Sequence, residues 1–306
     1  MKILVATEKP FAKAAVDGIR KIVEEAGYEL GLLEKYTDVK DLLNAVADAD
    51  ALIVRSDKVT KDVVDAAKNL KIVVRAGAGY DNLDLAACSA KGVVAMNTPG
   101  QNSNAVAELA LGMMIFMARN SFQPGTGTEL KGKKIGIHAY GNVGRLVANI
   151  AKGFGMQVYA FDPFVSADII ASDSDVKFVD NMETLYSTCD YVSLHIPAND
   201  QTKKSINYDL LSKMPKGATL VNTARKEVID EEGMLKLMTE RTDFKYVTDI
   251  KPDNDADMKQ FGTRYFATPK KMGAETAEAN INAGLAAANQ IVNFIKNGDN
   301  KFQVNK

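Results

Sequence analysis

Short apolar runs alternate with helical stretches along almost the whole chain of 306 residues. The runs "KILVA", "ALIVRS", "KIVVRAG" and "GVVAMNT" predict buried strands, with helix-forming stretches between them. A second series of such runs follows the loop at residues 121–134, where a proline and three glycines interrupt the pattern. Strands that alternate with helices form parallel sheets covered on both faces. The sequence therefore predicts an α/β protein, and its length favours two domains.

The composition is that of an ordinary globular protein with almost no net charge. A net charge of −1 gives no general attraction to nucleic acid or to anionic membranes. The longest apolar stretch, residues 106–118, contains Glu108 and is shorter than the roughly 20 residues of a membrane span. The N-terminal apolar run is too short for a signal-peptide core. Two cysteines, Cys88 and Cys189, fit a reducing compartment. We expect a soluble cytoplasmic protein.

The segment "GIHAYGNVGRLVANIAKGFGMQVYAFD", residues 136–162, has the order of a dinucleotide-binding unit: strand, glycine turn, helix, strand, acid. Gly141 lets the backbone approach a phosphate bridge at the helix N-terminus, and Gly144 lets the helix lie close to the strand. Ala139 stands where a glycine is usual, so we expect its φ to be negative. Asp162 would accept hydrogen bonds from ribose hydroxyls and repel a 2′-phosphate, which favours NAD over NADP. The alternative is a tight turn without a ligand.

Polar residues at the ends of predicted strands suggest how an anionic substrate is held. Arg225 could grip a carboxylate and the adjacent carbonyl oxygen with its planar fork, unless it forms a surface ion pair. Successive backbone N–H groups at Gly77 and Ala78 could bind a carboxylate. Arg55 is a candidate phosphate anchor with Lys58 as a possible helper, although a purely structural Arg55 stays open.

The two histidines, His138 and His195, fall inside or at the end of predicted strands. We expect them to be structural and poor proton shuttles. No cluster of His, Cys or acidic residues has the spacing of metal ligands, so we expect no metal.

Four further motifs carry a resemblance to a known family. They are "RAGAGYDNLDL" from Arg75, "NTPGQNSNAVAEL" from Asn97, "LHIP" at 194–197 and "NTARKEVIDEE" at 222–232. With these motifs the chain resembles the D-2-hydroxyacid dehydrogenases over nearly its whole length, and most closely their short 3-phosphoglycerate dehydrogenases. The resemblance implies an NAD-dependent dehydrogenase with two doubly wound domains and an active site in the cleft between them.

The resemblance also implies a domain division and an assembly. Residues 1–97 with 280–306 would form a flavodoxin-like substrate-binding domain, and 98–279 a Rossmann-type NAD-binding domain. Members of the family are usually homodimers joined through their NAD domains. The chain stops soon after its last predicted helix, so we expect neither a regulatory domain nor feedback inhibition by serine. Family members often place a basic residue near position 57, where this chain has Asp57, which weakens the case for a phosphate site.

Carried over position by position, the resemblance completes the list of expected site residues. The catalytic residues would be Arg225, Lys270 and Asn254. The cofactor-binding residues would be Ala78, Gly141, Asn142, Val143, Gly144, Asp162, His195, Ile196, Pro197, Thr223, Ala224, Asp249 and Gly273. The substrate-binding residues would be Arg55, Ser56, Arg75, Ala76, Gly77 and Asn102.

The implied reaction is the NAD-dependent oxidation of 3-phosphoglycerate to 3-phosphohydroxypyruvate, and its reverse, at the start of serine synthesis. The partner would be a small phosphorylated 2-hydroxy acid, with no nucleic acid and no membrane. A glyoxylate or hydroxypyruvate reductase on the same scaffold is one alternative. A catalytically weak, NAD-sensing interaction protein is another, because the family's proton-shuttling histidine is missing.

Lys270 occupies the place of that histidine, directly after Pro269 in "ATPKKMGA". Lys271 is the runner-up, because this turn is one residue longer than usual in the family. A free lysine has a pKa of ~10.4, so desolvation or nearby positive charge such as Arg225 would have to lower it for a shuttle near neutrality. Asn254 falls at the place of the glutamate that partners the histidine in other members. Asp253, Asp255 and Asp257 are alternative partners.

Overall fold

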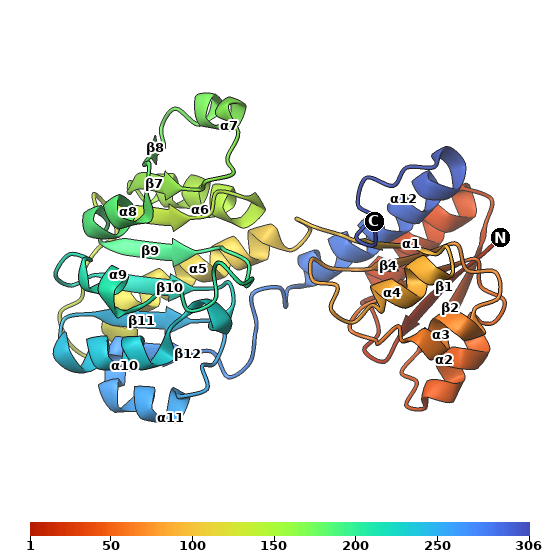
Figure 1. Cartoon of the computed structure of the whole chain (residues 1–306), viewed down its shortest axis with the longest axis horizontal. Helices are drawn as coiled ribbons and strands as arrows, with labels where there is room; N and C mark the ends of the chain where they lie inside the picture. Colours follow the sequence, from red (N-terminus) through yellow and green to blue (C-terminus); the bar gives the residue numbers. More distant parts are fainter. The chain divides into compact units, whose positions relative to one another are not determined.

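The computed structural model describes residues 1–306 and divides the chain into two compact units (Figure 1). Unit 1 comprises Met1–Asn102 and Glu275–Lys306, so the C-terminal segment returns to the N-terminal unit. Unit 2 comprises Ser103–Ala274. Each unit is built around its own parallel sheet.

Unit 1 contains a five-stranded parallel sheet in the order β2-β1-β3-β4-β5. The strands are β1 (Lys2–Thr7), β2 (Glu29–Glu34), β3 (Ala51–Val54), β4 (Ile72–Arg75) and β5 (Val94–Asn97). Every residue of β3 is buried, as an apolar run covered on both faces requires. This strand order is the flavodoxin-like one, in which the direction of winding changes between β1 and β3.

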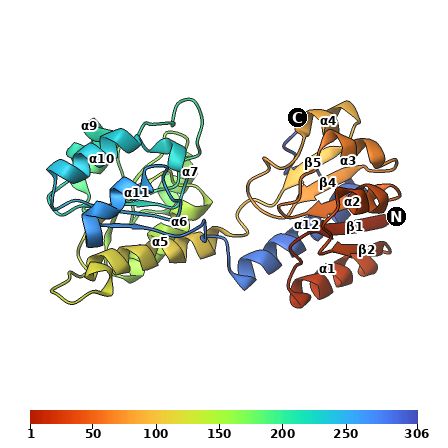
Figure 2. The same cartoon turned by 90° about the horizontal axis from the view of Figure 1, so that it is seen from below.

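Five helices cover the two faces of this sheet. On one face α1 (Lys13–Glu25) and α12 (Ala277–Asn297) pack together over Ile3, Val5, Ile53 and Val74 (Figure 2). On the other face lie α2 (Val39–Val46), α3 (Lys61–Ala66) and α4 (Leu85–Ala90), over Leu4, Leu52 and Val73. Consecutive residues of a strand thus point into different clusters, which is why these strands are apolar throughout.

Unit 2 contains a seven-stranded parallel sheet in the order β12-β11-β10-β9-β6-β7-β8. The strands are β6 (Lys134–His138), β7 (Gln157–Phe161), β8 (Lys177–Phe178), β9 (Tyr191–Leu194), β10 (Thr219–Asn222), β11 (Lys245–Thr248) and β12 (Tyr265–Ala267). This is the Rossmann order extended by one strand, with its reversal between β6 and β9. The predicted fold class, two doubly wound parallel sheets of these two types, is confirmed.

Helices cover both faces of the second sheet as well. On one face lie α5 (Ser103–Ala118) and α6 (Asn142–Gly153), and on the other α8 (Met182–Thr188), α9 (Tyr208–Ser212) and α10 (Glu231–Glu240). The short helices α7 (Ala167–Ser172) and α11 (Asp255–Met258) and the 3-10 turns η1 (Asn120–Phe122), η2 (Lys226–Val228) and η3 (Lys259–Arg264) complete the unit. No helix in the chain combines the length and apolar character needed to cross a bilayer.

Candidate functional site

The expected cofactor segments of unit 2 lie where its strand order reverses. Residues 139–141 follow β6, residues 195–197 follow β9, and these two strands are neighbours in the sheet. In open α/β sheets, ligands bind outside the carboxyl ends of the strands at such a reversal. The sheet therefore brings together two groups of residues that are more than fifty positions apart in the sequence.

The N-terminus of α6 offers free hydrogen-bond donors at this point. Gly141 is the N-cap and no side chain caps the helix. The first N–H that bonds back to the turn is that of Arg145, which donates to the Gly141 carbonyl at 3.0 Å. The N–H groups of Asn142, Val143 and Gly144 precede this bond and have no acceptor within the chain. Free N–H groups at the positive end of a helix dipole suit the phosphate bridge of a dinucleotide.

Gly144 lies against the strand that precedes the turn. A Cβ at this position would stand 2.3 Å from the Ala139 carbonyl oxygen and 2.9 Å from Ile137 Cγ2. Only glycine therefore allows α6 to pack this closely on β6.

The expected negative φ of Ala139 is wrong, because its φ is +77°. The residue adopts the left-handed region in order to turn the chain out of β6, and its N–H donates to the Phe161 carbonyl at 2.9 Å. An L-residue in this region carries a strain of roughly 1–2 kcal/mol. The chain therefore keeps the glycine-type turn without the glycine.

Asp162 comes directly after β7 and ties the second strand to the glycine turn. Its Oδ2 accepts the N–H of Tyr140 at 2.8 Å, and its Oδ1 accepts the N–H of Phe164 at 2.8 Å. A carboxylate has about four acceptor positions, so two remain for other donors. The residue can hold the turn and accept hydrogen bonds from a ribose at the same time.

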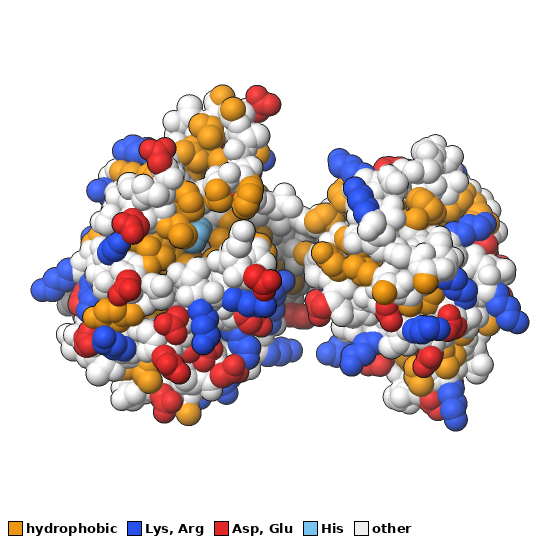
Figure 3. Space-filling view, in the orientation of Figure 1, with side chains coloured by type: hydrophobic (Ala, Val, Ile, Leu, Met, Phe, Trp, Pro, Cys, Tyr) orange, Lys and Arg blue, Asp and Glu red, His pale blue; other side chains and the backbone are white.

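Both histidines lie in unit 2, where Figure 3 shows a histidine among apolar side chains. His138 Nδ1 is 3.1 Å from the Tyr186 hydroxyl, and His195 Nε2 is 3.0 Å from the Ser193 hydroxyl. Burial lowers the pKa of His138 to about 4 and that of His195 to about 3. Both imidazoles are therefore neutral near pH 7 and lack the acidic imidazolium form that a proton donor needs, which agrees with their expected structural role.

Arg225 follows β10 and is held through its backbone. The buried side chain of Asn222 stabilises the turn with two hydrogen bonds. Its Oδ1 accepts the Ala224 N–H at 2.9 Å, and its Nδ2 donates to the Arg225 carbonyl at 3.0 Å. The Arg225 side chain is exposed and uses one N–H to bond the Ala224 carbonyl at 2.8 Å. Next to it, the Thr223 hydroxyl is buried without a partner, which suits a contact with a polar ligand group.

The turn that carries Lys270 and Lys271 folds around the carboxylate of Asp249. Asp249 follows β11 and is fully buried. Asp249 Oδ1 accepts the Thr268 hydroxyl at 3.0 Å and the Met272 N–H at 2.8 Å, and Oδ2 accepts the Gly273 N–H at 2.8 Å. These bonds bracket Lys270 and Lys271, both of which are exposed. Asp249 thus holds the turn that carries the expected proton donor.

The residues expected to partner Lys270 make other contacts. Asn254 Nδ2 donates to the Glu231 carbonyl at 3.1 Å. Asp253 pairs with Lys226 at 2.5 Å. Asp255 accepts the Tyr265 hydroxyl at 2.9 Å and pairs with two lysines, Lys251 and Lys259.

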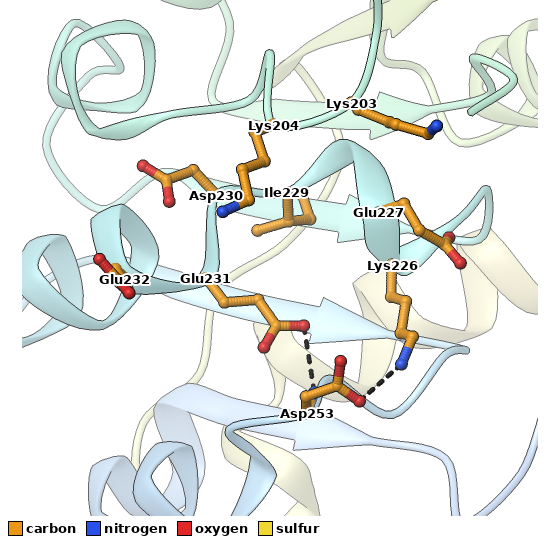
Figure 4. Close-up of a pocket in the computed structure, with 9 residues that line it drawn as sticks. All are labelled: Lys203, Lys204, Lys226, Glu227, Ile229, Asp230, Glu231, Glu232 and Asp253. Carbon is orange, nitrogen blue, oxygen red and sulfur yellow. Dashed lines mark hydrogen bonds and ion pairs between the residues drawn. The ribbon is translucent and has the colours of Figure 1, made fainter. Parts of the chain in front are cut away.

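A pocket of about 570 Å³ lies beside these contacts, and in Figure 4 Lys226 reaches toward Asp253 at one side of it. The pocket is lined by Lys203, Lys204, Lys226, Glu227, Ile229, Asp230, Glu231, Glu232 and Asp253.

Arg55 follows β3 in unit 1, at the point where this sheet reverses its strand order. Its Nη1 donates to the carbonyls of Lys9 and Pro10 at 3.0 and 3.1 Å, and its Nη2 donates to Asn280 Oδ1 at 2.6 Å. The guanidinium also lies 5.2 Å from the centre of the Phe11 ring. A guanidinium has five N–H donors, so two remain unused.

Arg75 and Gly77 form the second half of this group in unit 1. Arg75 Nε donates to the Arg55 carbonyl at 3.0 Å, and burial lowers the pKa of Arg75. Gly77 has a φ of +151°, and a Cβ there would overlap the Arg75 guanidinium. Gly77 uses its own N–H to bond the Arg75 carbonyl at 2.9 Å. Of the expected pair of free N–H groups, only that of Ala78 is therefore available. The other expected substrate residues are placed as follows: Ser56 is exposed, Ala76 is buried and Asn102 is half-buried.

The supporting roles of four polar residues were not part of the expectations from sequence, although Asp249 was expected in the cofactor site. Asn222 and Asp249 support the unit 2 turns, and Asp57 and Asn280 support Arg55. The available signal was a polar residue at or just after a buried strand, as in "TLVN" before Arg225. Such a residue is expected to have a hydrogen-bond partner, but the sequence does not say which one.

Comparisons with known proteins agree with this geometry. Residues 104–268 match the family described as D-isomer specific 2-hydroxyacid dehydrogenase, NAD binding domain. The chain is 36% identical to a hydroxypyruvate reductase of Thermotoga maritima over 86% of this chain and 90% of that protein. It is 35% identical to a D-3-phosphoglycerate dehydrogenase of Methanocaldococcus jannaschii over 90% of this chain and 55% of that protein. The chain therefore spans about half the length of that dehydrogenase.

Among solved structures, the NAD+-bound 3-phosphoglycerate dehydrogenase of Entamoeba histolytica is 50% identical, with a TM-score of 0.86. The match covers 100% of this chain and 99% of that one. The free N–H groups of α6 and the open acceptor positions of Asp162 fit the NAD+ that is bound in that structure. The chain therefore belongs to the D-isomer specific 2-hydroxyacid dehydrogenases and is an NAD-binding oxidoreductase.

Proposed function

We propose that the protein interconverts 3-phosphoglycerate and 3-phosphohydroxypyruvate with NAD. The observation that carries this proposal is Arg55, whose guanidinium is held at the strand-order reversal of unit 1 with two N–H donors unused. Two guanidinium N–H donors can bond the oxygens of a phosphate. The names of the Entamoeba histolytica and Methanocaldococcus jannaschii relatives support the same substrate.

The residues of unit 2 supply the remaining roles. Arg225 binds the substrate carboxylate and polarises the neighbouring C2 carbonyl, since four of its five N–H donors are unused. NAD, when bound in its reduced form, supplies the hydride that adds to C2. Lys270 donates the proton that the C2 oxygen takes up, and it regains a proton from solvent because it is exposed. In the oxidative direction Lys270 accepts that proton.

The substrate assignment predicts that Arg55→Ala raises the KM for phosphohydroxypyruvate by about 10- to 100-fold, the range expected for lost hydrogen bonds between charged groups. Hydroxypyruvate, which lacks the phosphate, should be affected far less. Steady-state NADH oxidation with both substrates measures this. Arg20→Ala is the control, because Arg20 pairs only with Glu24 on the surface of α1. Equal losses on both substrates would show that Arg55 does not bind the phosphate.

The proton-transfer role predicts that Lys270→Ala lowers kcat by about 10²- to 10⁴-fold, the usual contribution of a general acid. NADH binding, followed by cofactor fluorescence, should stay unchanged. Lys271→Ala is the comparison variant, because Lys271 is the other candidate in the same turn. If Lys271→Ala loses turnover and Lys270→Ala does not, the role belongs to Lys271. If both variants stay active, the proton comes from another group.

A hydroxypyruvate reductase is the second candidate, and the Thermotoga maritima relative favours it. Turnover of phosphohydroxypyruvate, hydroxypyruvate and glyoxylate side by side separates the two enzymes. A non-catalytic NAD sensor would show no turnover of any of them, and the exposed Arg225 argues against it. A role in serine synthesis, a homodimer and a cytoplasmic location remain expectations from the resemblance. Light scattering at several protein concentrations tests the homodimer.

A further inference from the structure

We propose that Asp57 is a positioning residue for Arg55 and thereby sets the preference for a substrate with a distal phosphate. The inference rests on the proposed function, in which Arg55 binds that phosphate. Asp57 is 3% exposed, and its carboxylate makes no ion pair. It is bonded instead by three neutral donors, which lie just after three different strands.

These donors tie the carboxyl ends of β1, β2 and β3 together. Asp57 Oδ1 accepts the N–H of Glu8 at 2.7 Å and the hydroxyl of Tyr36 at 2.9 Å. Its Oδ2 accepts the N–H of Arg55 at 3.2 Å. Burial and the Asp57 carboxylate raise the pKa of Tyr36 well above its usual value, so this hydroxyl stays protonated and donates.

The same carboxylate fixes both the backbone of Arg55 and the segment that holds its guanidinium. Glu8 is followed directly by Lys9 and Pro10, whose carbonyls accept Nη1, and by Phe11, whose ring lies under the guanidinium. Because Asp57 bonds the N–H of Glu8 and the N–H of Arg55, it fixes the distance between the side chain and its acceptors. Asn280 on α12 accepts a hydrogen bond from Arg55 Nη2 and so fixes the other end of the guanidinium.

Asp57 acts on Arg55 only through the backbone. A carboxylate paired directly with the guanidinium would occupy its donors and neutralise its charge. Here the acceptors of the guanidinium are neutral, namely two carbonyls and an amide oxygen. The positive charge and two N–H donors therefore stay available for an anion. The acid at position 57, which weakened the expectation of a phosphate site from the sequence, thus supports such a site through its contacts.

The test is Asp57→Asn, assayed with phosphohydroxypyruvate and hydroxypyruvate. The new amide would face the N–H of Arg55 with a donor in place of an acceptor. We expect the KM for phosphohydroxypyruvate to rise about tenfold, as loss of one hydrogen bond to a charged group predicts, with kcat little changed. The KM for hydroxypyruvate should change by less than about twofold, since no phosphate is bound.

Asp50→Asn is the matched control. Asp50 also accepts a backbone N–H, that of Lys2 at 2.8 Å, but this bond lies at the start of β1, and we expect no change with either substrate. Tyr36→Phe is a second, milder variant that removes one donor to Asp57, and it should change the two KM values in the same pattern. This variant decides the question if Asp57→Asn does not fold.

The positioning role is overturned if Asp57→Asn changes the KM for both substrates equally or changes neither. If Asp57→Asn does not fold, the same results in Tyr36→Phe overturn it. The outcome is separable from that of the proposed function. If Arg55→Ala discriminates between the two substrates and the Asp57 variant does not, only the present inference fails. If Arg55→Ala affects both substrates equally, the phosphate assignment fails and the positioning role fails with it.

Discussion

Ala139 is the residue at which this nucleotide turn departs most from its usual sequence. Its φ of +77° places an L-residue in the left-handed region, which costs roughly 1–2 kcal/mol. Ala139→Gly removes this strain but adds freedom to the unfolded chain, an opposing effect of roughly 0.5–1 kcal/mol. We therefore predict a gain in the free energy of unfolding of up to about 1 kcal/mol. Urea unfolding followed by far-UV circular dichroism measures it.

The same substitution at an ordinary helical position provides the control. Ala171 is exposed in α7 of the same unit, so Ala171→Gly should lower the free energy of unfolding, by up to about 1 kcal/mol. A loss of stability at Ala139→Gly similar to that at Ala171→Gly would show that the turn is not strained.

At the scale of elements, the strands and the helix α6 after the glycine turn could be predicted, because their signals are local. Apolar runs such as "ALIV" and "TLVN" predict buried parallel strands, and the spacing of Gly141, Gly144 and Asp162 predicts the turn, helix and acid around β6 and β7. The left-handed conformation of Ala139 could not be predicted in this way. Residue type alone argued against it, and the packing of α6 on β6 decided it.

The contacts that hold the site could not be predicted, because each joins distant residues. Asp249 accepts bonds from residues 268–273, more than eighteen positions further along the chain. Arg55 and Asn280 meet although 225 positions separate them. A polar residue has several possible partners of similar hydrogen-bonding strength, and only the tertiary fold selects among them.

Two glycines of α6 give a prediction about how this helix packs on β6. Gly144→Ala would place a Cβ 2.3 Å from a backbone carbonyl, which cannot move as a flexible side chain can. We expect a loss of about 1–3 kcal/mol in the free energy of unfolding, as overpacking usually costs. The displaced helix N-terminus should also weaken NADH binding at least about tenfold, since its N–H groups no longer meet the phosphates.

Gly153 at the end of the same helix is the control, because an added Cβ would have no atom within 4 Å beyond its chain neighbours and the backbone of its own helix. Gly153→Ala should leave NADH binding unchanged and keep or slightly raise stability. Unchanged NADH binding in Gly144→Ala would mean that the close packing of α6 is not needed for the cofactor.

At the scale of the whole molecule, the histidines are confined to one of the two units. The chain has 2 histidines, and both lie in the sheet of unit 2 or directly after it. Burial is the main cause of the lowered pKa of each, about 4 for His138 and about 3 for His195. An unfolded histidine has a pKa of roughly 6.5. Below pH ~6.5 the unfolded chain therefore binds protons that folded unit 2 does not bind.

This difference in proton binding between the unfolded and folded chain fixes the sign of the pH dependence of stability. The free energy of unfolding should fall as the pH drops from ~6.5 toward the folded-state values, by about 2 kcal/mol per histidine between pH 6.5 and pH 5 at most. His138→Gln removes one of the two groups, so this variant should lose about 2 kcal/mol less than the wild type over that interval, whatever its stability at pH 7. Urea unfolding at pH 7 and pH 5 gives both losses, and the carboxylates contribute equally to the two proteins. If the wild type and His138→Gln lose the same stability, His138 takes up a proton in the folded state, and its buried contact with Tyr186 does not exclude the charge.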